Sequence, residues 1–139
     1  MTTLRDTLNA IGNHLTQAGV VYWPGQTQEY TNPGTQPPLY AKRLPETPQT
    51  CAAINAYSLT IPANTNTPGM VIRFQVRSRA PQDADPLADS ILNALHGAHH
   101  QEWDGLSVGR ITHLSTAQLG ADPQTGLDER TDNYELITH

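Results

Sequence analysis

Residues 70–79 alternate between hydrophobic and polar side chains. The hydrophobic positions are Ile72, Phe74 and Val76, and the polar positions are Arg73, Gln75, Arg77 and Arg79. A period of two is typical of a strand with one buried face. The segment therefore predicts a strand whose hydrophobic face packs inward and whose polar face meets water or a partner.

The next segment, residues 85–97, predicts an amphipathic helix that packs on this strand. Its hydrophobic residues share one helix face because they recur at every fourth position. They are Leu87, Ile91 and Leu95. Asp85 is expected to cap the helix, Pro86 suits its first position, and Gly97 suits a left-handed end.

The remaining segments predict one more helix and several strands. The helix spans residues 3–18, with Thr2 or Thr3 as its cap and Gly19 as its stop. Residues 20–22 and 39–41 are short extended runs, and residues 24–38 between them form a long loop. Residues 51–61 are expected to pair with 70–79 across the turn 62–69. Residues 96–104 are polar, and two further extended segments, 106–114 and 134–139, lie on either side of a turn region, 120–131. This order predicts a single α+β domain over residues 1–139. Its expected architecture is a single mixed, mainly antiparallel sheet with two helices packed on one face.

Composition narrows the classes of function. The chain has 8 basic and 13 acidic residues, a net charge of −5, and one cysteine, Cys51. This charge disfavours nucleic-acid binding through phosphate neutralisation. No run approaches the roughly 18–20 apolar residues of a membrane span, and no secretion signal precedes the first helix. We therefore expect a soluble protein of a reducing cytoplasm, without membrane contact and without an internal disulfide.

Three histidines form the one cluster that suggests a metal. His96, His99 and His100 are accompanied by Glu102 and Asp104, and imidazole with carboxylate is a common zinc ligand set. Gly97 interrupts the helix that would bring His96 and His100 onto one face. A metal site is therefore disfavoured, and we expect no metal and no cofactor. Calorimetric titration with zinc tests this expectation.

Other catalytic groups are equally sparse. Cys51 begins an apolar strand, which favours an inert buried thiol, and no serine lies in a Gly-x-Ser-x-Gly turn. The carboxylates occur at turns and helix starts, where capping accounts for them: Asp83, Asp85, Asp89, Asp122, Asp128 and Glu129. No glycine-rich phosphate loop is present. The sequence predicts no enzyme.

The arginines on the polar face of the 70–79 strand are better candidates for a functional surface. Arginine is enriched at protein interfaces and pairs there with carboxylates, so Arg73, Arg77 and Arg79 indicate either an interface or a solvated strand face, with equal weight. Trp23 and Trp103 indicate either core packing or interface anchors.

Four segments of the chain resemble one family of phage proteins. They are FQVRSRAP, DPLADSILNALHG, WDGLSVGRI and the terminal GLDERTDNYELITH. The chain is similar to the tail terminator proteins of long-tailed phages that infect actinobacteria, also called minor capsid or minor tail proteins. The resemblance is clearest over residues 71–97 and 128–139, and the loops 24–38 and 63–69 depart from it.

The resemblance implies a structural virion protein of the tail and neck, assembled in the cytoplasm of the bacterial host. Such a protein forms a hexameric ring of identical subunits on the last ring of the tail tube, stops its polymerisation and offers a surface to the head connector. DNA would pass the lumen without specific binding. We expect contacts with other subunits or the tube from two surfaces: the face with Arg73, Gln75, Arg77 and Arg79, and the terminal hairpin with Asp122, Asp128, Glu129 and Arg130.

Three alternatives remain open at this stage. The first is another neck component, either a head-completion or a head-to-tail joining protein. The second is a monomeric binding module, and the third is a metal-dependent enzyme that uses the His96 cluster.

Overall fold

The computed structural model describes residues 3–25, 35–62 and 69–139. Within these ranges the chain forms two helices, α1 (Leu4–Gln17) and α2 (Asp85–Leu95), and six strands. The strands are β1 (Leu39–Ala41), β2 (Cys51–Thr60), β3 (Val71–Pro81), β4 (His99–Trp103), β5 (Leu106–Ala121) and β6 (Leu127–Thr138). No helix in the described ranges has the length and apolar character that a membrane span requires.

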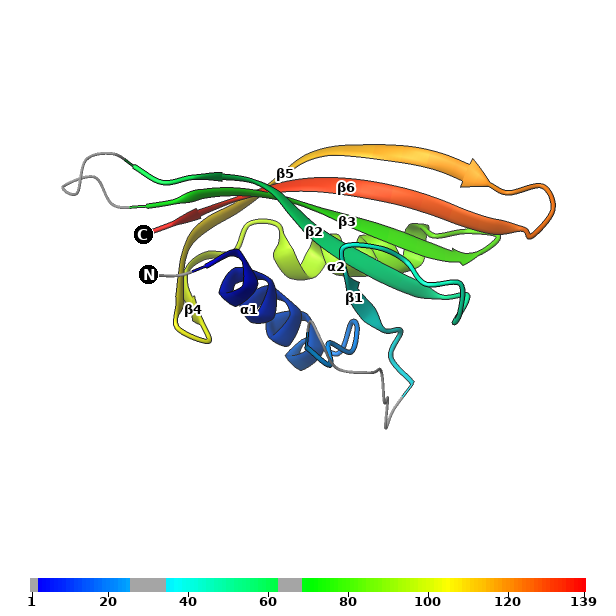
Figure 1. The fold of residues 1–139 in the computed structure, drawn as a ribbon, viewed down its shortest axis with the longest axis horizontal. Helices are drawn as coiled ribbons and strands as arrows, with labels where there is room; N and C mark the ends of the chain where they lie inside the picture. Colours follow the sequence, from blue (N-terminus) through cyan, green and yellow to red (C-terminus); the bar gives the residue numbers. More distant parts are fainter. Residues whose placement is uncertain (1–2, 26–34, 63–68) are drawn as a thin grey trace.

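The six strands form one sheet in the order β1-β2-β3-β6-β5-β4. β1 runs parallel to β2, and every other pair of neighbours is antiparallel. The sheet is curled into a half-barrel, and Figure 1 shows both helices on the same side of it. The α+β class with a mixed, mainly antiparallel sheet is therefore confirmed. We call the side that carries the helices the inner face and the opposite side the outer face.

Helix α1 begins at a reciprocal cap. The Thr3 hydroxyl accepts the N–H of Asp6, and the Asp6 carboxylate accepts the N–H of Thr3, which satisfies two N–H groups that the helix leaves free. Inside the helix, a Cβ on Gly12 would lie 2.3 Å from the indole Cγ of Trp23. Trp23 therefore packs directly on the helix backbone, and only glycine leaves room for it.

Helix α2 starts one residue earlier than the sequence predicts. Ala84, not Asp85, is the N-cap residue, and it has no side-chain cap of its own. Two other carboxylates replace that cap: Asp83 accepts the N–H of Asp85, and Asp128 of β6 accepts the N–H of Ala84. The C-terminal end of α2 agrees with the prediction, since Gly97 has a left-handed backbone conformation with a φ of 83°.

The core lies between the inner face of the sheet and the two helices. The predicted hydrophobic face of β3 is buried there, with Ile72, Phe74 and Val76 at 0–1% exposure. The ring of Phe74 stacks on that of Tyr134 in β6, with 5.2 Å between ring centroids. Burial of a side chain such as Phe74 contributes about 1.5–3 kcal/mol.

Two predicted boundaries are corrected by the structure. The run 20–22 is not a strand, because only Tyr22 makes a bridge, to Pro38, and the N–H of Trp23 donates to the side chain of Thr16 in α1. The predicted C-terminal strands 106–114 and 134–139 are too short. β5 continues to Ala121 and β6 begins at Leu127, so the turn is shorter than the predicted region 120–131.

Strand β4 is absent from the prediction for a physical reason. Of its five residues only Trp103 is buried, so it lacks the alternation that identifies a strand. It forms because its backbone pairs with the first part of β5, where Trp103 is opposite Leu106. The second half of β5 is exposed on both faces and was missed for the same reason.

Candidate functional site

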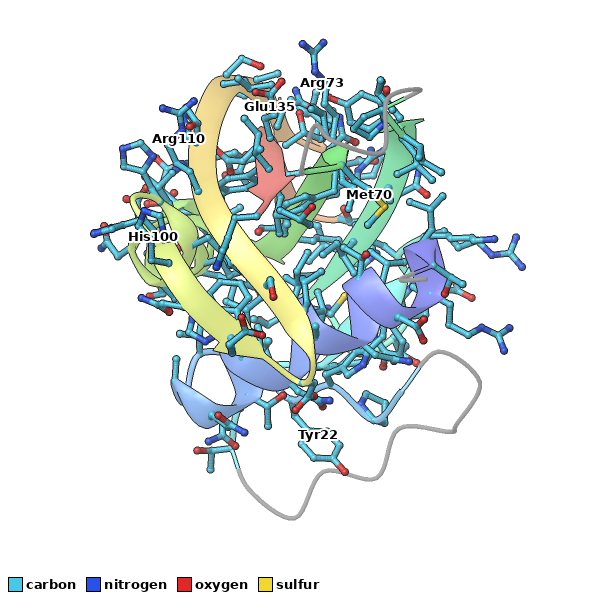
Figure 2. All side chains as sticks on the ribbon, turned by 90° about the vertical axis from the view of Figure 1, so that its left-hand side faces the viewer. Tyr22, Met70, Arg73, His100, Arg110 and Glu135 are labelled. Atoms are coloured by element: carbon cyan, nitrogen blue, oxygen red, sulfur yellow. The ribbon has the colours of Figure 1, made fainter. Side chains whose placement is uncertain are left out.

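The outer face of β3 and β6 carries a ladder of paired polar side chains. Arg73 pairs with Glu135 at 3.1 Å, the Gln75 amide donates to the Asn133 side chain at 3.2 Å, and Arg77 pairs with Glu129. Figure 2 shows Arg73 and Glu135 side by side at the rim of the sheet. Exposed pairs of this kind are each worth about 0–1 kcal/mol. The predicted residues are thus present on one surface, and each also has a partner within the chain.

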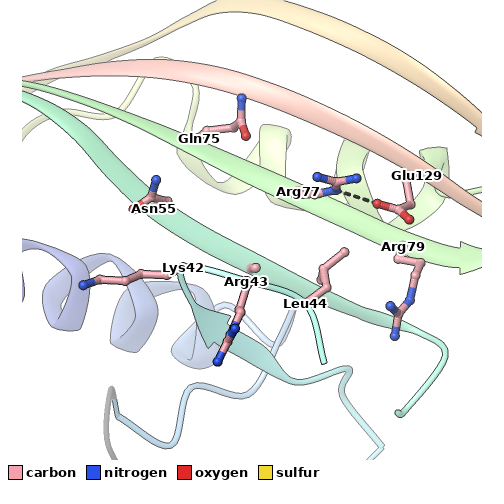
Figure 3. A pocket seen from close by; sticks show the side chains of 9 residues that line it. Lys42, Arg43, Leu44, Asn55, Gln75, Arg77, Arg79 and Glu129 are labelled. Atoms are coloured by element: carbon pink, nitrogen blue, oxygen red, sulfur yellow. Dashed lines mark hydrogen bonds and ion pairs between the residues drawn. The ribbon is translucent and has the colours of Figure 1, made fainter. Parts of the chain in front are cut away.

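Arg79 lies on the same strand face but is not available to solvent. Its side chain is buried and donates to the backbone carbonyls of Pro45, Pro48 and Gln49 at 2.7–3.0 Å. These bonds hold the loop between β1 and β2 over the outer face (Figure 3). The expectation that Arg79 is available to water or to a partner is therefore corrected: its guanidinium satisfies several loop carbonyls that would otherwise lack donors.

Several residues of the C-terminal hairpin that were expected at the surface point into the protein. Because β6 starts at Leu127, alternation turns Asp128, Arg130 and Asp132 to the inner face, opposite Ala80, Ser78 and Val76 of β3. All three side chains are at least 92% buried. Asp128 and Arg130 are therefore not on the exposed surface that the sequence suggests. Asp122 is exposed in the turn, and Glu129 points to the outer face.

Arg130 holds helix α2 against the sheet. Its guanidinium contacts Asp132 on its own strand at 3.1 Å and Asp85 and Asp89 on α2 at 3.1 and 2.8 Å. Hydrogen bonds from Gln118 and from Arg130 lower the pKa of Asp85. The signal was present in the sequence, since Asp85 and Asp89 are four apart and therefore share one helix face.

Catalytic groups do not form a relay among the described residues. His113, Asp132 and Thr116 lie together, but Nε2 of His113 makes both contacts, at 3.0 Å to Asp132 and 2.9 Å to Thr116. A Ser-His-Asp type relay needs one ring nitrogen for the nucleophile and the other for the carboxylate. Burial raises the pKa of the Cys51 thiol, which keeps it in the less reactive protonated form.

In the candidate metal cluster the rings of His99 and His100 lie edge-on to each other, with 5.8 Å between centroids, and each of the three histidines has a further partner. His96 accepts the N–H of His113 at 3.1 Å, the His99 ring contacts the Gly97 carbonyl, and the His100 ring lies edge-on to His139 at 5.3 Å. Within the described ranges no group of three or more His, Cys, Asp or Glu side chains suits a metal ion.

Both tryptophans pack within the chain. Trp23 is 5% exposed and Trp103 is 7% exposed, and both join the hydrophobic core. The Trp103 indole stacks on the ring of His14, with 3.8 Å between centroids. Of the two interpretations of these residues, core packing agrees with their burial.

Besides the short terminal strands β1 and β4, two stretches of the longer strands have no neighbouring strand on one side among the described residues. β1 covers β2 only as far as Ile54, which leaves residues 55–60 as an open edge. On the other side of the sheet, β4 and the 97–98 backbone cover β5 only to Ile111, and the His96 side chain accepts the N–H of His113. Residues 114–121 are therefore the second open edge.

Neither open edge carries a charged residue or a proline. Proteins protect free strands with charges or proline, yet residues 55–60 (NAYSLT) and 114–121 (LSTAQLGA) contain neither. β2 has a register shift relative to β3 at 56/58, and β5 has shifts relative to β6 at 113/115 and 118/120, which increase the twist of both strands. The two open edges are therefore protected by twist, without charge or proline.

The exposed hydrophobic side chains lie on the same two edges. In the described ranges the large hydrophobics that stand out from the surface are Tyr57 (51%), Leu59 (37%), Ile61 (48%), Leu114 (44%) and Leu119 (49%). Four belong to the open edges and Ile61 follows directly. Exposed hydrophobic residues that collect on particular surfaces mark interaction sites. The sequence alone does not predict these edges, because an edge depends on the order of strands in the sheet.

A comparison with protein-family models gives one match, described as "Bacteriophage tail terminator protein", over residues 14–139. The match includes everything from the second half of α1 to the C-terminus. No curated protein matches the chain significantly.

Proposed function

The chain belongs to the bacteriophage tail terminator protein family, and from this we propose that it closes the end of the phage tail tube as a hexameric ring. The ring ends polymerisation of the tube and offers its free side to the head connector. The protein acts as a structural part of the virion and not as an enzyme.

The observation that carries the proposal is the pair of open edges. A ring needs two different surfaces on opposite sides of each subunit, so that each copy binds the next by rotation. Residues 55–60 of β2 lie on one side of the sheet and residues 114–121 of β5 lie on the other. In a sheet of this order β2 and β5 run antiparallel, so equivalent copies around a ring would join them as an antiparallel pair.

The charge of the chain suits a ring through which DNA passes. Each subunit has a formal net charge of −5, and an acidic channel repels phosphate and does not retain it. Actinobacteriophage origin, which the sequence resemblance suggests, stays a prediction.

Electron microscopy of the purified chain mixed with its tail tube protein tests the proposal. We expect rings at tube ends and tubes of limited length. Bare ends on tubes that grow without limit would contradict the function.

Deletion of the gene separates this function from that of another neck component. Loss of a terminator leaves overlong tails, whereas loss of a head-completion protein leaves filled heads that leak or lack tails. A monomeric binding module, in turn, would stay monomeric in light scattering and would ignore the tube protein.

A further inference from the structure

Two cations at the end of β1 have no partner for their charge. Lys42 and Arg43 form the turn that leaves β1, both side chains are exposed, and neither makes a hydrogen bond or ion pair in the described part of the chain. Their backbones are fixed: the Lys42 N–H donates to Ile54 at 2.8 Å, and the Arg43 N–H donates to Ala41 at 2.9 Å. Lys42 is held at a φ of 74°, a conformation that a non-glycine residue rarely adopts.

Lys42 and Arg43 line a hollow on the outer face, and Figure 3 shows their charged ends at its margin, directed away from Gln75 and Glu129. The hollow has a volume of about 360 Å³, and its lining includes Lys42, Arg43, Asn55 and Gln75. The other arginines there are already satisfied, since Arg77 pairs with Glu129 and Arg79 binds loop carbonyls. The hollow thus combines free positive charge with room for an acidic group from outside.

Its position coincides with the start of an open edge. The Lys42 turn lies beside Ile54, and the open edge of β2 begins at the next residue, Asn55. A strand that pairs antiparallel with residues 55–60 would reach the hollow with its C-terminal end. If that strand is β5 of a neighbouring copy, with Ala121 opposite Asn55, its next residue is Asp122.

Asp122 has the geometry to complete this contact. It is exposed in the turn between β5 and β6. Its Oδ1 accepts the N–H groups of Gln124 and Thr125 at 2.8 and 3.4 Å, and within the described ranges its Oδ2 has no partner. The turn therefore presents an oriented carboxylate oxygen outward.

We propose that Asp122 of one subunit binds Lys42 and Arg43 of the next subunit and thereby sets the register of the strand pair between them. This inference rests on the proposed ring. The open edges are uncharged and rich in small polar residues, and the register of such strands is weakly specified. A charge pair at one end of the strand pair distinguishes its correct register from registers shifted by one or two residues. Charged groups at interfaces contribute mainly such specificity.

A carboxylate from a second copy fits this site better than a DNA phosphate. DNA binding needs a row of cations that follows the backbone, whereas only two unpaired cations border the hollow and Glu129 lines it. A single acidic side chain at the end of a strand matches both the charge and the size.

Charge reversal in both directions tests the proposal. The variants are K42E/R43E, D122K and the combined K42E/R43E/D122K, each full length and mixed with tail tube protein. We expect the first two to lower the fraction of ring-capped tube ends at least tenfold and the combined variant to recover most of it. Arg110→Glu is a matched control for charge reversal at an exposed position away from the contact, and it should cap normally.

Site-specific cross-linking gives a second measurement. With cysteines at positions 42 and 122 and a short bismaleimide, rings should give a ladder of oligomers that ends at the ring number. Native Cys51 is buried and should not react.

Normal capping by K42E/R43E, or rings that give no ladder, would overturn the inference and leave the proposed function intact. Failure of the unmodified chain to cap tubes would instead overturn the proposed function. Tight binding of duplex DNA that K42E/R43E abolishes would identify a phosphate as the occupant and would also overturn the inference.

Discussion

At the scale of residues, Arg130 shows how a charged side chain can be structural. It lies on the inner face with 6% exposure and joins Asp132 of the sheet to Asp85 and Asp89 of α2. The sequence suggested a surface role because Arg130 falls in a segment rich in turn residues. Burial becomes evident only once β6 is known to start at Leu127, since one residue of shift would reverse every side chain.

Arg130→Ala should therefore destabilise the chain strongly. It leaves the buried carboxylate of Asp132 without its arginine, with only the contacts of His113 and Thr116, and loss of one member of a buried ion pair typically costs about 3–5 kcal/mol. Urea denaturation measures the free energy of unfolding. Arg73→Ala is the control, since it removes an exposed pair and should cost less than about 1 kcal/mol. Equal losses in both variants would contradict a special role for Arg130.

At the scale of elements, the sequence predicts those segments whose burial alternates. β3, the hairpin it forms with β2, and both helices could be predicted because each has one hydrophobic face. β4 and the second half of β5 could not, because backbone pairing holds them while their side chains are exposed. The same distinction explains the candidate site: the polar ladder was visible in the sequence, but the open edges depend on which strands become neighbours.

Lysine on the open edge of β5 should block assembly without unfolding the subunit. Leu114 and Leu119 are 44% and 49% exposed, so L114K/L119K should change the free energy of unfolding by no more than about 1 kcal/mol. Charges on a free strand oppose pairing with another strand, and we expect at least tenfold fewer capped tube ends in electron micrographs. Asn93→Lys, on an exposed position of α2, is the control and should cap normally. Unimpaired capping by L114K/L119K would exclude this edge from the ring.

At the scale of the whole molecule, charge is distributed unevenly. Six of the eight basic residues lie on or beside the outer face, although the chain is acidic as a whole. They are Lys42, Arg43, Arg73, Arg77, Arg79 and Arg110. Glu135 and Glu129 pair with two of these arginines and the loop covers Arg79, but no helix covers the outer face (Figure 1). The remaining cations are therefore open to contact with another subunit or the tube.

Reversal of charge at Arg73 and Arg77 should weaken ring formation. The variant R73E/R77E also places like charges beside Glu135 and Glu129, so a loss of capping alone would not identify the cause. The matched variant R73E/E135R/R77E/E129R restores both pairs within the chain but exchanges their positions. If the arginines contact a neighbour, this variant should regain stability in urea and still cap poorly. Normal capping by it would show that the ladder serves only the sheet.

The two long hairpins point in opposite directions. β2 and β3 meet at the end of the sheet that contains Thr60 and Val71, whereas β5 and β6 turn at the other end, next to Pro81 (Figure 1). In a ring whose copies pair residues 55–60 with residues 114–121, the strands tilt from the ring axis, because these two edges lie at opposite ends of the sheet. One rim would carry the Thr60 and Val71 ends of every copy, and the other would carry every β5–β6 turn. Such a ring has a direction. It can recognise one kind of neighbour below and another above, and the rim left exposed after it binds a tube is not the rim that a further copy would need in order to bind.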